Sequence, residues 1–334
     1  MNKKIIRWIL WIVMLGGILL CTSVFSLCVG SANVSFKAMF ASIFNSRDSA
    51  EYSILFNIRL PRIILGFSVG GALALSGVML QGMFRNPLVE PYTLGISGGA
   101  ALGVALNIVL RLNNTLGVVS LPVSGFFGAI LVVLLVYSVS LRKEGLRIQG
   151  ILLTGVMLSF ISSSLIMLIM SVSSMEDLQG IVFWIMGSLE EPNWLLIQVV
   201  LWVSVSGLVI SYLFCLDLNA LSLGDEEAQH LGIKVESTKR LLFILSSLLT
   251  GLSVSVSGVI GFVGLVVPHF MRMFVGNDHR ILLVSSFLCG AVFLILCDTL
   301  ARTIIAPMEL PVGVITGVLG GTIFVYTLTR KQIT

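Results

Sequence analysis

Residues 60–82, LPRIILGFSVGGALALSGVMLQG, decide the fold class of this chain. After Arg62 the run contains no charged residue, and it is longer than the roughly 20 apolar residues that cross a bilayer as a helix. Lipid offers no hydrogen-bond partner to exposed backbone groups, so an apolar run of this length is stable there as a helix. The stretch therefore predicts a transmembrane helix in an all-α protein.

Further apolar runs, separated by polar clusters, repeat this pattern along the 334 residues. Apolar residues make up 57% of the chain and charged residues only 11%, too few for the polar shell of a soluble domain. We predict one polytopic transmembrane domain, residues 1–334, with about ten spans. Their expected ranges are 7–29, 60–82, 93–110, 116–140, 148–172, 192–215, 240–259, 261–275, 281–304 and 313–330. The third, eighth and tenth are short and rich in glycine, so we expect bends or partial spans there.

The charges predict how the chain is oriented. The first apolar run is too long for a signal peptide, so we expect it to be retained as a span. If both termini are cytoplasmic, fourteen of the 20 Lys and Arg residues fall inside and the other six outside, as the positive-inside rule requires.

A weak internal repeat relates the two halves of the chain at an offset of 181 residues, from Arg59 to Arg240. It matches Ser76-Gly77-Val78 with Ser257-Gly258-Val259 and Pro87 with Pro268. Five predicted spans separate the two copies, so the second copy would be inverted, as in many transporters. We predict repeat halves at about 59–172 and 240–330. Chance matches among common membrane residues are the alternative.

Arginines mark the outer ends of two predicted spans. Arg59 and Arg62 flank a proline, and we expect them to form an exposed positive site suited to bidentate capture of carboxylates on a partner. Residue types alone leave anchoring at the lipid head groups as the alternative. Asp298 and Arg302 are four residues apart, so they share a helix face and are expected to form an ion pair rather than a proton relay.

The longest polar stretch on the inner side is LNALSLGDEEAQHLGIK at 218–234. Its acidic residues 225–227 suit the first turn of a short helix, and Gly232 is placed to end that helix. An amphipathic element under the membrane is a natural docking surface for a cytosolic partner. A solvated connector is the alternative.

The sequence contains no motif for covalent chemistry. It lacks the P-loop pattern GxxxxGK[ST], HExxH and GxSxG. We therefore expect no catalytic, cofactor or metal site in this chain, and we expect that the chain is not an enzyme.

Several motifs, in this order, resemble the FecCD-type permease family, the membrane subunits of ferric-siderophore, haem and cobalamin importers. They are RLPR at 59–62, SGVMLQGMFRNPLVEPYTLGISGGA at 76–100, LGDEEAQHLGI at 223–233, SGVIGFVGLVVPHFMR at 257–272 and ELPVG at 309–313. The resemblance implies a type II ABC importer permease in a bacterial plasma (inner) membrane. It implies a homodimer, two cytosolic ATPase subunits that bind the ATP and Mg²⁺, and an extracytoplasmic substrate-binding protein.

The resemblance also implies roles for residues. Arg59, Arg62 and Arg302 match family arginines that pair with acidic groups of the binding protein. The residues that match the ATPase-coupling element are Leu223, Gly224, Asp225, Glu226, Glu227, Ala228, Leu231 and Gly232. The fifth and tenth spans match the helices that line the pathway, and the pathway or gate candidates are Ile148, Gln149, Met157, Ser159 and Met167.

Two other functions stay open on sequence alone. An ion-coupled secondary transporter is the main alternative, and a membrane enzyme or receptor is the other. The sequence does not identify the cargo.

Overall fold

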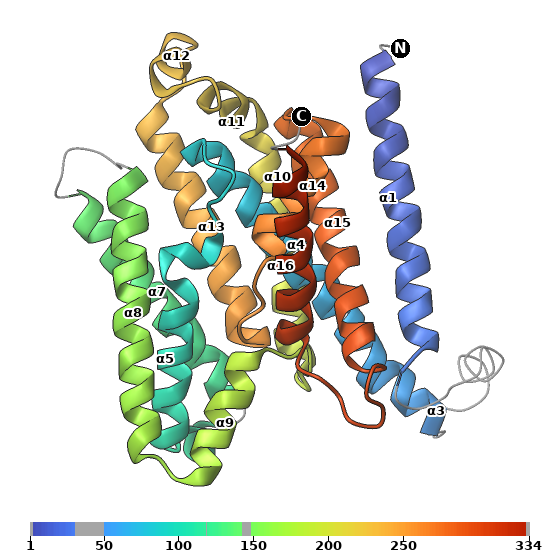
Figure 1. The fold of residues 1–334 in the computed structure, drawn as a ribbon, viewed down its shortest axis with the longest axis vertical. Coiled ribbons are helices and arrows are strands. Elements are labelled where there is room, and N and C mark those ends of the chain that lie inside the picture. The colour runs from blue at the N-terminus through green and yellow to red at the C-terminus, as the bar shows by residue number, and fades with distance from the viewer. Residues whose placement is uncertain (1–2, 31–49, 118, 142–147, 332–334) are drawn as a thin grey trace.

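The computed structural model describes residues 3–30, 50–117, 119–141 and 148–331, and within them the chain is helical without strands (Figure 1). Seven of the described helices are long and apolar enough to cross a membrane, and three shorter apolar helices accompany them. The long helices are α1 (Lys3–Cys28), α4 (Leu60–Phe84), α7 (Ser120–Leu141), α8 (Ile148–Val172), α10 (Trp194–Leu213), α13 (Val235–Ser257) and α15 (His279–Ala301). The shorter ones are α5 (Ile96–Val109), α14 (Val263–Val275) and the apolar part, Val312–Thr327, of α16 (Val312–Lys331). The all-α membrane fold is confirmed, with the third, eighth and tenth expected spans as the shorter helices.

Short helices fill the connections. They are α3 (Ala50–Ser53), η1 (Ile54–Arg59), η2 (Pro91–Leu94), α6 (Leu112–Leu116), α9 (Met175–Met186), α11 (Cys215–Leu221) and α12 (Asp225–His230). Helix α9 was not among the expected elements. Ser174 caps its first turn by accepting from the Asp177 N–H, and acidic residues in that turn complement the helix dipole.

Helix α4 forms the centre of the bundle, and nearly all of its side chains are buried. It packs against α10, α13, α14 and α15. Small residues permit this close packing in lipid. A Cβ at Gly70 would lie 2.3 Å from the carbonyl oxygen of Gly290 on α15, so the two helices approach closely only because neither residue carries a side chain there.

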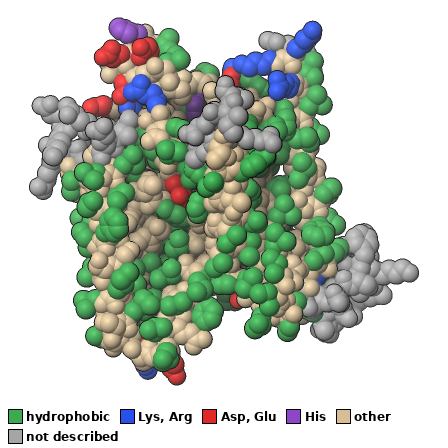
Figure 2. Space-filling model, viewed as in Figure 1, with side chains coloured by type: hydrophobic (Ala, Val, Ile, Leu, Met, Phe, Trp, Pro, Cys, Tyr) green, Lys and Arg blue, Asp and Glu red, His purple; other side chains and the backbone are tan. Residues whose placement is uncertain are grey.

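The two ends of the molecule differ. Figure 1 places α12 and both termini at one end, and α9 and α3 at the other; we call these the α12 end and the α9 end. Figure 2 shows charged and histidine side chains gathered at the α12 end, with apolar side chains over the sides. A common side for the termini and the 218–234 element agrees with the expected topology.

Helices α4 and α13 begin the two predicted repeat halves and run in opposite directions, α4 from the α9 end and α13 from the α12 end (Figure 1). This is the arrangement an inverted repeat requires. The halves differ at the matched glycines, because Gly77 lies within α4 whereas Gly258 ends α13. The boundaries of the two halves remain a prediction.

Candidate functional site

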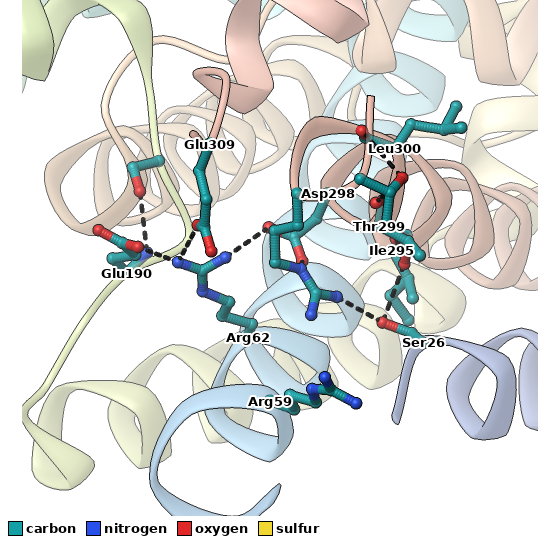
Figure 3. Close-up of polar contacts among 12 residues, drawn as sticks. Ser26, Arg59, Arg62, Glu190, Ile295, Asp298, Thr299, Leu300 and Glu309 are labelled. Carbon is teal, nitrogen blue, oxygen red and sulfur yellow. Dashed lines mark hydrogen bonds and ion pairs between the residues drawn. The ribbon is translucent and has the colours of Figure 1, made fainter. Parts of the chain in front are cut away.

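Ionised side chains meet at the α9 end around Arg62, in the first turn of α4 (Figure 3). Its Nη2 lies 2.7 Å from Oε2 of Glu309 and also contacts Oε1 of Glu190. Its Nη1 lies 3.9 Å from Oδ1 of Asp298. These carboxylates come from the connection after α15, the connection between α9 and α10, and α15 itself. One guanidinium group therefore links four separate parts of the chain.

Arg302 extends this cluster towards α1. Its Nε lies 2.9 Å from Oδ2 of Asp298, one helical turn earlier, and its Nη2 donates to Oγ of Ser26 at 2.8 Å. The expected ion pair between Asp298 and Arg302 is thus confirmed. Because Asp298 lies between two guanidinium groups, the geometry favours a structural ion pair over a proton relay.

Arg59 lies apart from these carboxylates (Figure 3). Its Nη1 donates to the carbonyl oxygen of Leu27 at 2.5 Å. Its guanidinium group crosses Gly30, where an added Cβ would lie 2.8 Å from Nη2. Arg59 therefore ties the start of α4 to the end of α1.

The expectation of an exposed arginine site is wrong. Arg59, Arg62 and Arg302 are only 2%, 5% and 3% exposed. A buried guanidinium group needs acceptors, and here carboxylates and backbone carbonyls of the chain itself provide them. A docking role for these arginines stays a prediction.

A cavity of about 410 Å³ opens beside the cluster. Its lining includes Arg62, Glu190, Glu191 and Asn57. The Glu190 side chain is 63% exposed, whereas Arg62 beneath it is buried. Solvent and a partner can therefore reach the carboxylate of Glu190 first. Burial raises the pKa of neighbouring Glu191, even though its carboxylate accepts from the Asn193 N–H.

The polar element at the α12 end has the form that its sequence predicts. Residues 225–230 form α12, with the acidic residues in its first turn, and Gly232 follows it at a positive φ of 86°. Gly224, just before the helix, has φ 147°, a conformation that favours glycine. A Cβ there would also lie 1.9 Å from Oε2 of Glu227.

Helix α12 is held to the bundle on one side and open on the other. Ala228 is fully buried, and Asp225 accepts from Nζ of Lys239 on α13 at 2.5 Å. Leu223 and Leu231 are 66% and 63% exposed, although both are apolar. Exposed leucines beside an acidic helix form a surface suited to a protein partner.

The pathway candidates fall on different faces of α8. Met157 and Met167 are exposed, and Ser159 packs against α5, with its Cα 3.4 Å from where a Cβ of Gly98 would lie. The hydroxyl of Ser159 donates to the carbonyl oxygen of Gly155 in its own helix. Ser159 is therefore a helix-packing residue here. Ile148 and Gln149 begin α8, but their side chains lie outside the part of the chain that the structure describes.

Sequence reasoning missed the acidic partners of Arg62. Glu309 belongs to the ELPVG segment that the sequence analysis singled out, so a signal was present. Glu190, 128 residues from Arg62 in the chain, gave no such signal, because it lies in none of those motifs. Glu90 lies within the motif at 76–100 but was assigned no role there, whereas in the structure it accepts from the backbone N–H of Phe262.

Comparisons with known proteins agree with this architecture. A model of the FecCD transport family matches residues 18–330. The hemin transport system permease protein of Yersinia pestis is 40% identical over 310 residues, which cover 92% of each chain. The molybdate import system permease protein of Haemophilus influenzae is 36% identical and covers 94% of each chain. A solved structure of a metal-chelate type ABC transporter in an inward-facing conformation has a TM-score of 0.85 and 33% identity, covering 96% of this chain and 98% of that one.

Proposed function

Because this chain belongs to the FecCD transport family, we propose that it is the membrane-spanning permease subunit of an ATP-driven importer for an iron chelate, haem or cobalamin. The family match over residues 18–330 is the observation that carries this proposal. Two copies would form the pathway, with two cytosolic ATPase subunits at the α12 end and a binding protein at the α9 end. This arrangement corresponds to an inner-membrane protein with cytoplasmic termini.

The ATPase subunits would act through α12. The exposed Leu223 and Leu231 would enter the ATPase surface, and the ion pair between Asp225 and Lys239 would pass movement of α12 to α13. Because α13 runs to the α9 end, closure of the ATPase subunits on ATP can change the helix packing at both ends. The chain itself would catalyse no covalent step.

The pathway would lie between two copies, along α8 and α16. Both helices carry exposed apolar side chains, including Phe160 and Leu168 on α8 and Val318 and Val325 on α16. Such surfaces suit a neighbouring copy or a bulky, partly apolar cargo. Met157 and Met167 would belong to this surface, because methionine adapts to irregular partners.

The binding protein would dock on the cluster around Arg62. Its carboxylates would have to replace those already bound there, and the exposed Glu190 is the easiest to displace. Docking would then loosen the connection between α9 and α10, so delivery of cargo and opening of the α9 end would be one event.

Reconstitution of the complex tests the function. The chain, its ATPase and its binding protein are placed in liposomes, and ATP hydrolysis is measured with hemin, a ferric siderophore, cobalamin and, given the molybdate permease relative, molybdate. We expect one cargo-loaded binding protein to stimulate hydrolysis and ATP-dependent uptake. Uptake by the chain alone, driven by a proton or sodium gradient, would instead establish the ion-coupled alternative.

A further inference from the structure

The connection between α4 and α5 forms hydrogen bonds with the segment at the start of α14. Glu90 accepts from the backbone N–H of Phe262, with Oε1 2.8 Å from the nitrogen. The hydroxyl of Tyr92 donates to the carbonyl oxygen of Ile260 at 2.9 Å and accepts from the Ile260 N–H at 3.1 Å. Two irregular connections, 85–95 and 258–262, are therefore joined by side chains of the first to backbone groups of the second.

The lengths of the flanking helices indicate that these contacts lie inside the bilayer. Helix α5 has 14 residues and α14 has 13, so each is about 20 Å long, shorter than a hydrocarbon core of about 30 Å. In Figure 1, α14 reaches the α12 end and α5 reaches the α9 end. Their N-terminal ends therefore meet inside the bilayer, where each backbone N–H needs a partner within the protein.

The carboxylate of Glu90 provides that partner, and no described cationic side chain pairs with it. Among the residues that the structure describes, its carboxylate forms no ion pair, and it accepts from the backbone N–H of Phe262. The partly positive N-terminal end of α14 favours an acceptor at this point. An ionisable side chain at membrane depth is costly, so a specific task for Glu90 is expected.

Phe262, which donates to Glu90, also packs against α16. Its φ of 67° is in the left-handed region, and its side chain lies over Gly320 and Gly321. A Cβ at Gly320 would be 2.5 Å from Cβ of Phe262, so the two helices touch directly at this point. His269 and Phe324, with ring centroids 6.1 Å apart, form a second contact between α14 and α16.

We propose that Glu90 is a positioning residue of the transport pathway, which holds the first turn of α14 against α16 by accepting the Phe262 N–H at membrane depth. The inference rests on the proposed function, in which α16 lines that pathway. Loss of the acceptor would free Phe262 and let α16 move relative to α14. The role requires an acceptor oxygen and not a negative charge.

Spin-label distances on the purified chain test this inference without any partner. In a cysteine-free background, labels are attached at Met273→Cys on α14 and Val325→Cys on α16, two exposed positions. The variants are Glu90→Ala, Glu90→Gln and, as the matched control, Thr93→Val. Thr93 lies in the same connection, but its hydroxyl donates only to the carbonyl oxygen of Glu90, at 2.6 Å.

We expect Glu90→Ala to raise the population with a displaced distance about tenfold, because it leaves a buried N–H without a partner. Glu90→Gln and Thr93→Val should match the wild type, since glutamine keeps an acceptor oxygen. If Glu90→Ala does not fold, Gly320→Ala tests the same contact from α16 and should displace the distance too. A wild-type distance in Glu90→Ala or Gly320→Ala overturns the proposal, and so does a Glu90→Gln variant as displaced as Glu90→Ala.

A functional measurement in the reconstituted complex separates this inference from the proposed function. Glu90→Ala should raise the ATP hydrolysed per cargo molecule imported, whereas Glu90→Gln should not. If the wild-type complex shows no cargo-stimulated hydrolysis, the proposed function fails, and the spin-label distances still decide the role of Glu90.

Discussion

Arg62 and Glu309 are 247 residues apart in the chain, yet Nη2 of Arg62 lies 2.7 Å from Oε2 of Glu309 at the α9 end (Figure 3). Their ion pair joins the start of α4 to the connection between α15 and α16. The same guanidinium group contacts Glu190, which belongs to a third segment. Opening this end of the molecule therefore requires these contacts to separate or to be exchanged for others.

Glu190 competes with a partner carboxylate for Arg62, so Glu190→Gln is expected to strengthen docking of the binding protein. The effect should be about two- to fivefold in Kd, because an ion pair whose carboxylate is open to solvent, as that of Glu190 is, contributes about 1 kcal/mol. Arg62→Gln should weaken docking more than tenfold. Surface plasmon resonance at low and high salt measures both, and the gain from Glu190→Gln should shrink at high salt.

Glu176→Gln is the matched control, because it removes the same charge from an exposed glutamate in the first turn of α9. It should leave docking near the wild-type value. Equal effects of the Glu190 and Glu176 variants would show that only the net charge of this end matters, and competition for Arg62 would be rejected.

Asp298→Asn is expected to lower the stability of the chain by about 3 kcal/mol or more, because it leaves Arg302 buried beside an uncharged side chain. Thermal unfolding in detergent measures the change. The double variant Asp298→Leu with Arg302→Met removes both charges and should recover most of the loss. An unchanged Tm for Asp298→Asn would mean that the buried pair contributes little.

The spans could be predicted from the sequence because apolar composition alone determines them. Helix α9 could not, because at 12 residues it is too short to register as a span and two acidic residues open it. The capping serine, Ser174, was the available signal. The burial of Arg59 and Arg62 was also beyond the sequence, since their acceptors lie far away along the chain.

The matched tripeptides at Gly77 and Gly258 show why local structure was harder to predict than the number of spans. Gly77 packs inside α4, where a Cβ would lie 1.9 Å from the carbonyl oxygen of Gly264. Gly258 ends α13 at a φ of 67°. Glycine fits both the close packing within a helix and the positive φ at a helix end, so the same tripeptide continues one helix and ends another. Long-range packing decides between them.

Leu231→Asp is expected to weaken association with the ATPase subunits about tenfold or more, because it places a charge where an exposed apolar side chain would enter the partner. The permease itself should remain folded, since Leu231 is outside the core. Co-purification and cargo-stimulated ATP hydrolysis measure the effect. His230→Asp, at the exposed neighbouring position, is the control, and an equal loss for both would point to charge alone.

Gly77→Ala is expected to destabilise the bundle by about 1–3 kcal/mol or to prevent its folding, because the new methyl group meets the backbone of Gly264. Gly16→Ala in α1 is the matched control, since an added Cβ there has no neighbour within 4 Å. It should be neutral or slightly stabilising, because alanine favours a helix. Thermal unfolding compares them, and equal melting temperatures would contradict the close packing of α4 on α14.

Acid is expected to weaken the attachment of α1 at the α12 end, because the carboxylate of Asp278 is protonated at low pH. Arg280 donates to its carboxylate at 2.7 Å, Lys4 at 3.1 Å and Asn219 at 3.2 Å, and these bonds, that of Arg280 first, hold the pKa of Asp278 well below its usual range. A lowered pKa in the folded state means that Asp278 stabilises the fold fully above the unfolded pKa of about 3.9. That contribution decreases as the pH falls from there towards the folded pKa.

The difference in Tm between the wild type and Asp278→Asn should therefore be constant from pH 5 to 8 and shrink below about pH 4. Asparagine does not ionise, so the variant should show little of this acid dependence. Thermal unfolding across the pH range measures the difference. A difference that changes near neutral pH would assign the dependence to another group. One that persists unchanged to pH 3 would show that folding does not lower the pKa of Asp278, and the prediction would fail.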